Sequence, residues 1–324
     1  IEETGLLPHL NPGLLSWSEL ASLKQVAPSM GIMLEQVSDR LHAPGEAHQH
    51  AATKRADVRL RTLEDAGRLS VPFTSGMLIG IGETPGERVD TLLALRATHR
   101  RHGHLQEVIV QNFRAKADTA MRDAPEPDAD EMVAAVATAR VLLGPTVHLQ
   151  APPNLSPDAM GRVLAAGIDD WGGVSPVTPD HVNPEAPWPA LDRLAAVSEE
   201  GGFVLSERLT AYPEYVTTPD PWLAGRMRAP VQALAGPDGL ADPATRVQPQ
   251  VWQDPVVEPH GMSQAMRAVI DGDGGGDSAA DGRNARAADR DDAVHRAVYG
   301  DVHAVAEGVV AANAPCPEAP PRSR

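Results

Sequence analysis

The stretch FTSGMLIGIGETPGE, residues 73–87, indicates how this chain folds. It begins as an apolar strand that glycines interrupt at Gly76, Gly80 and Gly82, and it leads into the acidic start of a helix at Glu87. Glycine inside a strand marks a bulge or a close approach by a ligand or by another backbone. A glycine-rich strand end that feeds a helix is where βα proteins place small-molecule ligands. The stretch therefore predicts either one wall of a binding site or a tightly packed strand.

Strand-like and helix-like segments alternate on both sides of this stretch. The predicted strands are residues 31–36, 71–81, 107–113, 147–151, 169–174 and 203–209, and the predicted helices are residues 53–67, 87–99, 128–143, 157–166 and 187–200. Repeated strand–helix units predict parallel strands joined by right-handed crossovers. No G-x-G-x-x-G motif opens the first unit, as a dinucleotide-binding fold requires. We therefore predict an α/β fold built as a partial or complete βα barrel.

The composition limits the class of protein. A chain of 324 residues with 42% apolar content can bury a large core. Its net charge of −16 argues against nucleic acid or an anionic membrane as a partner. No apolar run reaches the roughly 18 residues of a membrane span, and no signal peptide is recognised. We expect a cytoplasmic protein.

Changes in composition and apolar periodicity divide the chain into three parts. Residues 1–255 carry the strand–helix alternation, whereas residues 256–292 include a Gly/Asp/Ala-rich run that predicts a disordered linker. Residues 293–324 predict a short helical piece and a Pro-rich tail that holds the sole cysteine, Cys316. One cysteine cannot form an internal disulfide or hold a cysteine-ligated cluster, so no metal ligands are predicted in this chain.

Polar side chains stand at the predicted carboxyl ends of successive strands, which form the active-site face of a βα barrel. The set is His9, Asn11, Glu35, Ser38, Arg40, Gly80, Gly82, Glu83, Gln111, Asn112, Gln150, Asn154, Asp169, Asp170, Trp171, Ser175, Asn183 and Glu185. Amides, hydroxyls and carboxylates can read the edges of a heterocycle or the hydroxyls of a sugar chain. Any one of them is more often a turn or cap residue, but six consecutive strand ends carry at least one.

Trp171 and the histidines each have a structural alternative. Trp171 precedes two glycines in a long, Pro-stiffened loop, which predicts a stacking face for a ligand or else a packing residue. The histidines of the run HRRHGH, residues 99–104, predict a basic helix end rather than a metal site. His42, His48 and His50 fall in a polar loop and are predicted to be solvated.

Six strings of this sequence together resemble the FO synthase family of radical S-adenosylmethionine (SAM) enzymes. The strings are LLPHLNPG, APSMGIMLE, FTSGMLIGIGET, GHLQEVIVQNF, LQAPPNL and DDWGGVSPVTPDHVNPEAPWP. Residues 76–83 also resemble the adenine-contacting G-x-I-x-G-x-x-E pattern of radical SAM barrels, with Leu78 at the Ile position. The resemblance runs from about Thr4 to Trp252.

The resemblance implies a radical SAM partial (βα)6 TIM-like barrel that binds S-adenosyl-L-methionine and a [4Fe–4S] cluster. In this family a 5′-deoxyadenosyl radical takes a hydrogen atom from 5-amino-5-(4-hydroxybenzyl)-6-(D-ribitylimino)-5,6-dihydrouracil, the adduct of a tyrosine-derived group with a ribityl-uracil. Ring closure with loss of ammonia then gives 7,8-didemethyl-8-hydroxy-5-deazariboflavin, the chromophore of coenzyme F420. The implied partners are this adduct, an electron donor such as ferredoxin or flavodoxin, and the radical SAM half that forms the adduct.

Carried over by position, the resemblance assigns two sets of residues. SAM is assigned to Glu35, Ser38, Arg40, Gly76, Gly80 and Glu83. The substrate is assigned to His9, Asn11, Gln111, Asn112, Gln150, Asn154, Asp170, Trp171, Ser175 and Asn183. No residue is assigned as the proton donor for ammonia loss.

One departure from the family pattern is large, because the C-x3-C-x2-C cluster motif is absent from the sequence that opens at Ile1. We expect the cluster cysteines to lie upstream of Ile1. The chain would then be a fragment of the ring-closing half, lacking its N-terminal cluster-binding part, from a fused bifunctional form, and inactive in isolation. Two alternatives stay open. In the first, the chain is part of the paralogous 4-hydroxybenzyl-transferring half or of a related menaquinone-pathway enzyme. In the second, it is a non-catalytic remnant that keeps a nucleotide-shaped pocket.

Overall fold

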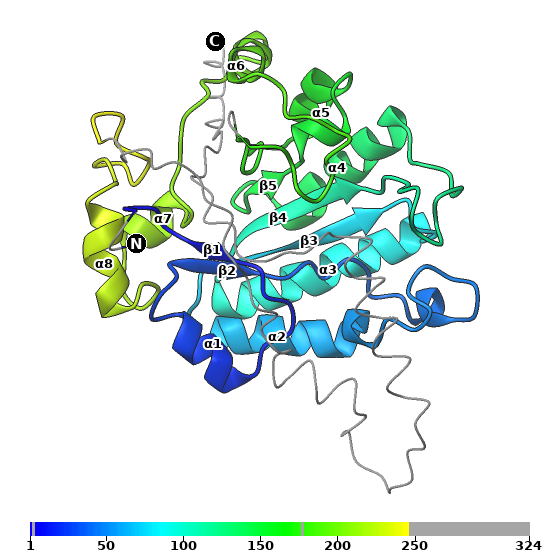
Figure 1. The fold of residues 1–324 in the computed structure, drawn as a ribbon, viewed down its shortest axis with the longest axis horizontal. Helices are drawn as coiled ribbons and strands as arrows, with labels where there is room; N and C mark the ends of the chain where they lie inside the picture. The colour runs from blue at the N-terminus through cyan, green and yellow to red at the C-terminus, as the bar shows by residue number, and fades with distance from the viewer. Residues whose placement is uncertain (2–3, 176–177, 246–324) are drawn as a thin grey trace, which may run out of the picture.

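A parallel sheet of five strands organises the computed structural model, which describes residue 1, residues 4–175 and residues 178–245 (Figure 1). The strands are β1 (His9–Leu10), β2 (Ser29–Gly31), β3 (Phe73–Ile79), β4 (Leu105–Asn112) and β5 (Leu149–Gln150). They pair in parallel in the order β1-β2-β3-β4-β5, so the order in the sheet is the order in the chain. Each connection must therefore return to the starting edge of the sheet, which the helices do.

In the described part of the chain, eight helices surround the sheet, and the first six of them pack side by side in chain order. They are α1 (Trp17–Leu23), α2 (Ala56–Arg68), α3 (Pro85–His102), α4 (Ala129–Leu143), α5 (Met160–Ala166), α6 (Leu191–Glu200), α7 (Pro213–Thr217) and α8 (Gly225–Gln232). From α1 to α6, each helix contacts the next one along the chain. In Figure 1, α1, α2 and α3 lie along one side of the sheet, while α7 and α8 lie near the N-terminus. Short 3-10 turns occur at Asp39–His42, Ala52–Lys54 and Pro153–Leu155.

The two faces of the sheet have different environments. Phe73, Met77 and Ile79 of β3 belong to the large apolar core that also contains buried residues of α1 to α6. Because side chains alternate along a strand, Thr74 and Leu78 point to the opposite face. We call the first the helix face and the second the inner face. Every residue of β3 is buried, so both faces are covered, as is usual for parallel sheets.

Local sequence signals account for the ends of α3. Thr84 accepts a hydrogen bond from the Glu87 backbone, and the Glu87 side chain accepts one from the Thr84 backbone, which forms a capping box. Pro85 occupies the first turn, and Gly103 ends the helix in the left-handed region at φ 66°. The helix is therefore longer at both ends than the predicted residues 87–99.

The predicted α/β fold with parallel strands is confirmed, but several predicted boundaries are wrong. Residues 169–174 and 203–209 are not strands but contain isolated bridge residues, among them Asp170, which pairs with Gln150. Gly67, the last residue of the predicted helix 53–67, lies inside α2, where an added Cβ would come within 2.6 Å of the His102 ring. This glycine permits close contact between α2 and α3. Helices α1, α7 and α8 were not predicted.

The three-part domain division stays a prediction. The described residues end at 245, so the predicted linker at 256–292 and the tail at 293–324 lie outside them. Within the part of the chain that the structure describes, no helix is long and apolar enough to cross a membrane.

We predict that Gly76→Ala destabilises the fold. A Cβ at Gly76 would lie 2.3 Å from the Ile109 carbonyl oxygen of β4, which is backbone and cannot move aside. Overpacking of this kind costs about 1–3 kcal/mol of unfolding free energy, measurable by urea denaturation. Gly86→Ala is the matched control, since its Cβ would meet nothing nearer than the Thr84 hydroxyl at 3.8 Å. The prediction fails if both variants unfold at the same urea concentration.

Candidate functional site

Several of the predicted site residues lie along the edge formed by the carboxyl ends of the parallel strands, where α/β proteins bind ligands. Glu35 follows β2 and bridges to Met77 of β3, while Asp170 bridges to Gln150 at the end of β5. Asn112 is the last residue of β4. The candidates for SAM therefore lie by β2 and β3, and most candidates for the substrate lie by β4 and β5.

Glu35 lies at the centre of a buried ionic cluster. Its Oε1 accepts a hydrogen bond from Arg59 Nη1 at 2.8 Å, and its Oε2 lies 3.0 Å from both Lys54 Nζ and His48 Nε2. All four residues are buried. Glu35 itself has a φ of 62°, in the left-handed region that non-glycine residues rarely adopt. Strained residues of this kind concentrate at functional sites.

The cluster is electrostatically matched to an ionised Glu35. Burial alone would raise the pKa of Glu35, but the charges of Lys54 and Arg59 and the hydrogen bond from His48 hold it well below its usual value. Burial lowers the pKa of His48 despite the neighbouring carboxylate, so its imidazole is neutral at pH 7. The prediction that His48 is solvated is wrong. Two cations therefore face one carboxylate in this cluster.

Ser38 and Arg40 contact the start of α3 rather than the Glu35 carboxylate. Arg40 Nη2 donates to Glu87 Oε2 at 2.8 Å and to the Gly82 carbonyl at 2.7 Å. The Ser38 hydroxyl donates to the other oxygen of Glu87. The Arg40 hydrogen bond lowers the pKa of Glu87 to about 2. These contacts join the segment after β2 to the turn after β3.

Glu83 shapes the turn that follows β3. Its buried carboxylate accepts hydrogen bonds from the backbone N–H groups of Gly80 at 2.8 Å and Ile81 at 2.9 Å. It also accepts one from Arg88 Nε at 2.6 Å. These donors use both oxygens of Glu83, so this residue acts on the site through the conformation of the turn.

The glycines of the opening stretch are explained by packing. Gly76 lies against the β4 backbone, and Gly80 has a φ of 89° with a virtual Cβ only 2.5 Å from Pro127. Gly82, at φ 100°, is exposed and has no neighbour closer than 3.6 Å to a virtual Cβ. Close packing thus accounts for Gly76 and Gly80, while Gly82 is the position with open space around it.

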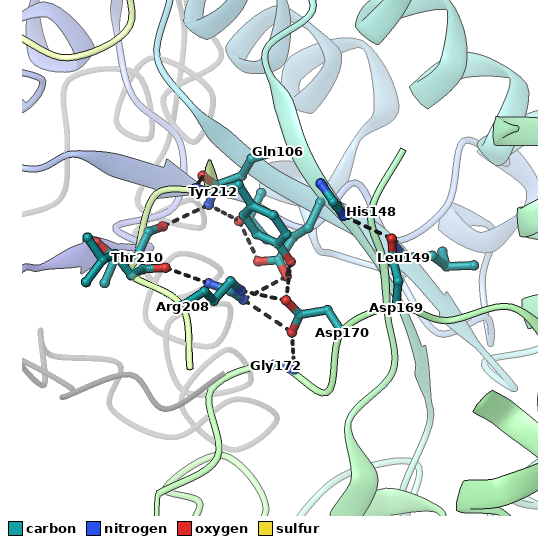
Figure 2. A network of polar contacts seen from close by, with 12 residues as sticks. Gln106, His148, Leu149, Asp169, Asp170, Gly172, Arg208, Thr210 and Tyr212 are labelled. Carbon is teal, nitrogen blue, oxygen red and sulfur yellow. Dashed lines mark hydrogen bonds and ion pairs between the residues drawn. The ribbon is translucent and has the colours of Figure 1, made fainter. Parts of the chain in front are cut away.

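A second buried network lies on the inner face and is shown in Figure 2. Arg208 Nε donates to Asp170 Oδ2 at 2.5 Å, and its Nη2 lies 3.3 Å from Glu107 Oε2. The Tyr212 hydroxyl lies 2.6 Å from Asp170 and 2.9 Å from Glu107, so it bridges the two carboxylates. The Arg208 guanidinium also stacks 4.2 Å from the centre of the Tyr212 ring. All four side chains are buried.

The environment of this network shifts the ionisation of its members. Burial raises the pKa of Glu107, and the charge of Asp170 raises it further against the opposing effect of Arg208. Burial also raises the pKa of Tyr212 well above 10, so the phenol stays protonated and can donate. Arg208 remains charged, because its carboxylate partners outweigh the effect of burial on its pKa.

The network continues toward the amino ends of the strands. The Thr210 carbonyl accepts hydrogen bonds from Ser29 Oγ at 2.6 Å and from Gln106 Nε2 at 3.1 Å. Ser29 Oγ in turn lies 2.8 Å from His9 Nδ1. Burial and the charge of Arg208 lower the pKa of His9 to about 4. In βα folds this end of the strands serves stability rather than catalysis, so we read the network as structural.

Three of the predicted amides meet beside β4 and β5. Asn154 Nδ2 donates to Asp180 Oδ2 at 2.8 Å and to the Ala186 carbonyl at 2.9 Å. Asn183 Nδ2 donates to the same Asp180 oxygen at 3.1 Å. Asn112 Nδ2 donates to the Leu155 carbonyl at 3.0 Å. The end of β4 and the turn after β5 are thus connected through the backbone of residues 154–155.

The remaining substrate candidates are scattered. The Ser175 hydroxyl accepts a hydrogen bond from the Thr178 backbone at 3.0 Å, as a turn residue does. Gln150 packs against Gly172, whereas Gln111 is partly exposed and Asn11 is exposed. These positions do not converge on the amides around Asp180.

Trp171 packs in the core of the helix face. It is 2% exposed, and its Nε1 donates to Ser198 Oγ of α6 at 3.2 Å. The structure therefore favours the packing interpretation of Trp171 over the stacking one.

Sequence reasoning missed several residues of these clusters: His48, Lys54, Arg59, Glu107, Arg208 and Tyr212. A signal existed for Glu107 and Arg208, since each is a charged residue at or within an apolar, strand-like run. A charge in such a run is buried only if it is paired. The loop containing His48 and Lys54 offers no comparable signal.

No metal centre is formed by the described residues. No group of three or more His, Cys, Asp or Glu side chains there is arranged to hold a metal ion. Ile1, upstream of which the cluster cysteines are expected, is partly buried, and its carbonyl accepts a hydrogen bond from the Gly5 backbone at 2.8 Å. The expectation of cluster cysteines upstream of Ile1 stays a prediction.

The histidines at and after the end of α3 have structural roles. His102 Nε2 lies 2.8 Å from Glu64 Oε1, and His104 is buried. The last turn of α3 also carries His99, Arg100 and Arg101. The predicted basic end of this helix is therefore confirmed.

Comparison with known proteins identifies the family. The chain is 52% identical over 319 residues to a protein named FO synthase from Streptomyces coelicolor and 57% identical over 258 residues to one from Mycobacterium tuberculosis. It is 48% identical over 241 residues to the 7,8-didemethyl-8-hydroxy-5-deazariboflavin synthase of Methanopyrus kandleri, and it covers 71% of that protein. The chain belongs to the FO synthase family.

The chain covers unequal shares of its FO synthase relatives. The three matches span 97%, 79% and 74% of this chain in the order given. The chain spans 35% of the Streptomyces coelicolor protein and 30% of the Mycobacterium tuberculosis protein, about a third of their length. No family model matches the chain.

Among solved structures the chain is similar to HydG, a maturase of the [FeFe]-hydrogenase. The identity is 16% and the TM-score is 0.42, over 49% of this chain and 36% of HydG. A similarity at that level supports no inference.

We predict that Arg208→Met is strongly destabilising. The substitution leaves the buried carboxylates of Asp170 and Glu107 without their cation, which costs about 3–5 kcal/mol of unfolding free energy. Arg162→Met is the matched control, because Arg162 and its partner Asp130 are 54% and 81% exposed and such a pair contributes less than about 1 kcal/mol. Equal losses for the two variants in urea denaturation would refute the assignment.

We predict that the stabilising effect of Glu35 depends on pH. Its pKa in the folded chain is held well below the ordinary value of 4.5, so its contribution is present above that value and is lost as the pH falls below it. The difference in unfolding free energy between the wild type and Glu35→Gln should therefore be largest near pH 6 and should shrink below about pH 4. Denaturation series at several pH values measure it, and a difference that stays constant down to about pH 3 contradicts the prediction.

Proposed function

We propose that this chain is part of the FO synthase activity that closes the deazaflavin ring. The reaction is the cyclisation of the 4-hydroxybenzyl adduct of 5-amino-6-(D-ribitylamino)uracil to 7,8-didemethyl-8-hydroxy-5-deazariboflavin, with loss of ammonia. The observation that carries the proposal is the 48% identity over 71% of a relative that is named for this product. The longer relatives are named only FO synthase.

The proposal includes a radical SAM partial barrel as the fold. It is supported by a parallel sheet whose strands follow the chain order and by helices α1 to α6, each of which contacts the next. Such an arrangement is the one from which βα barrels are built.

The residues after β2 fit SAM chemically. The methionine part of SAM carries an ammonium and a carboxylate, and the Glu35 cluster offers a buried carboxylate beside the cations of Lys54 and Arg59. We propose that the Glu35 cluster, with Ser38 and Arg40, lies by the ribose and methionine parts of SAM, and that the turn from Gly80 to Glu83 lies by the adenine. SAM would supply the radical that abstracts hydrogen from the substrate.

A [4Fe–4S] cluster does not fit the residues of this chain. Cys316 is the sole cysteine of the sequence, whereas the family motif needs three. The cluster ligands must therefore come from outside these 324 residues, and we propose that the isolated chain is inactive. The electron donor, such as ferredoxin or flavodoxin, and the adduct-forming half belong to the same proposal, as does a cytoplasmic location.

A chimera tests the proposed function. Residues 1–324 replace the corresponding part of the Methanopyrus kandleri synthase, which supplies the remainder of that protein, and the product formed from purified adduct is identified by mass and fluorescence. We expect the deazaflavin and one equivalent of ammonia, as with the unaltered synthase assayed alongside as the control.

Two outcomes would contradict the proposal. Adduct formation from tyrosine and the ribityl-uracil, without ring closure, would indicate the 4-hydroxybenzyl-transferring half. A folded chimera that cleaves no SAM and converts no adduct would indicate a non-catalytic remnant.

A further inference from the structure

Two amide side chains at the carboxyl edge of the sheet have buried oxygens without a hydrogen-bond partner. Among the described residues, Asn112 Oδ1 and Asn154 Oδ1 accept no hydrogen bond, although the two residues are only 2% and 4% exposed. A buried acceptor left unpaired costs about 1–3 kcal/mol. Such a group calls for an explanation, and a bound ligand is one.

The orientation of both amides is determined by their neighbours. Asn112 Nδ2 faces the Leu155 carbonyl, and Asn154 Nδ2 faces the Asp180 carboxylate and the Ala186 carbonyl. All three neighbours are acceptors, so each amide must turn its NH2 group toward them. A flipped amide would bring two oxygens together. The unpaired atoms are therefore carbonyl oxygens, which need N–H or O–H donors.

The two acceptors belong to one place in the fold. Asn112 ends β4, and its amide is held by the residue that directly follows Asn154. Arg114 donates to the same Leu155 carbonyl. Phe113 follows Asn112 and packs on the other face of the strand, in a small apolar cluster with Leu78 and Ile81. Two amide oxygens without partners suit a ligand that carries N–H groups on its edge.

We propose that Asn112 and Asn154 accept hydrogen bonds from the N–H groups of an aminopyrimidine. The inference rests on the proposed function, which supplies such a ligand in the uracil part of the adduct. It selects two of the ten predicted substrate residues and gives them the same role, that of acceptor. Donors of this chemistry also occur as hydroxyls of the ribityl chain, so the test uses the two parts of the ligand separately.

The test measures binding of 5,6-diaminouracil and of ribitol to the full 324-residue chain by calorimetry. Asn112→Leu keeps the approximate shape of the side chain and removes both the Oδ1 acceptor and the Nδ2 donor, and the Leu155 carbonyl keeps Arg114 as its donor. We expect its affinity for 5,6-diaminouracil to fall at least about tenfold while its melting temperature is unchanged or higher, because an unpaired buried acceptor is removed. Thr210→Val is the control, since Thr210 Oγ1 is also buried and unpartnered but lies at the amino side of the sheet, and we expect unchanged affinity.

The outcomes separate this inference from the proposed function. Three results would overturn the inference. The first is an unchanged affinity of Asn112→Leu for 5,6-diaminouracil, and the second is a lower melting temperature of this variant without a loss of affinity. The third is that the wild type does not bind 5,6-diaminouracil. Ribitol binding that alone depends on Asn112 overturns the choice of the heterocycle. If Asn112→Leu does not fold, the ¹⁵N-labelled wild type is titrated with 5,6-diaminouracil instead. The side-chain amide resonances of Asn112 and Asn154 must then shift, and resonances that stay constant overturn the inference. The chimera assay judges the ring-closing activity independently of all these results.

Discussion

The position of the last described part of the chain depends on the ion pairs of Arg208. Residues 203–209 form no strand, so this segment has no ladder of hydrogen bonds to the sheet. Its side chains hold it instead, because Arg208 pairs with Asp170 and Glu107 and Tyr212 bridges the same two carboxylates. Buried carboxylates so close together are tolerated only with a compensating cation, so the segment and the sheet depend on each other.

This constraint separates the amino end of the sheet from its carboxyl end. Toward the amino ends of the strands, hydrogen bonds join His9 to Ser29, Ser29 to the Thr210 carbonyl, and the Tyr212 backbone to Gln106, while Thr210 Oγ1 has no partner. Toward the carboxyl ends, the amides of Asn112 and Asn154 keep an unused acceptor each. A sheet that pairs its charged groups at one end and leaves two amide acceptors unpaired at the other has a stable base and a polar edge suited to a ligand.

The two buried ionic clusters shift the pKa of a carboxylate in opposite directions. Glu35 pairs with Lys54 and Arg59 beside a neutral His48, and its pKa is lowered. Around Arg208 two carboxylates share one guanidinium, and the pKa of Glu107 is raised instead of lowered. In the second cluster the side chains of Arg208, Asp170, Glu107 and Tyr212 are bonded to one another.

The sequence by itself determined the parallel α/β fold and the family, because these depend on short-range patterns and on contiguous strings such as residues 73–87. It also placed Glu35, Asn112, Asn154 and Asp170 near the strand ends. Only the tertiary structure decided their partners. Tyr212 is 105 residues from Glu107, and Arg208 is 38 residues from Asp170, so no local pattern records these pairs. Burial decided the rest, since a charge or amide removed from water takes the partners that the fold brings to it.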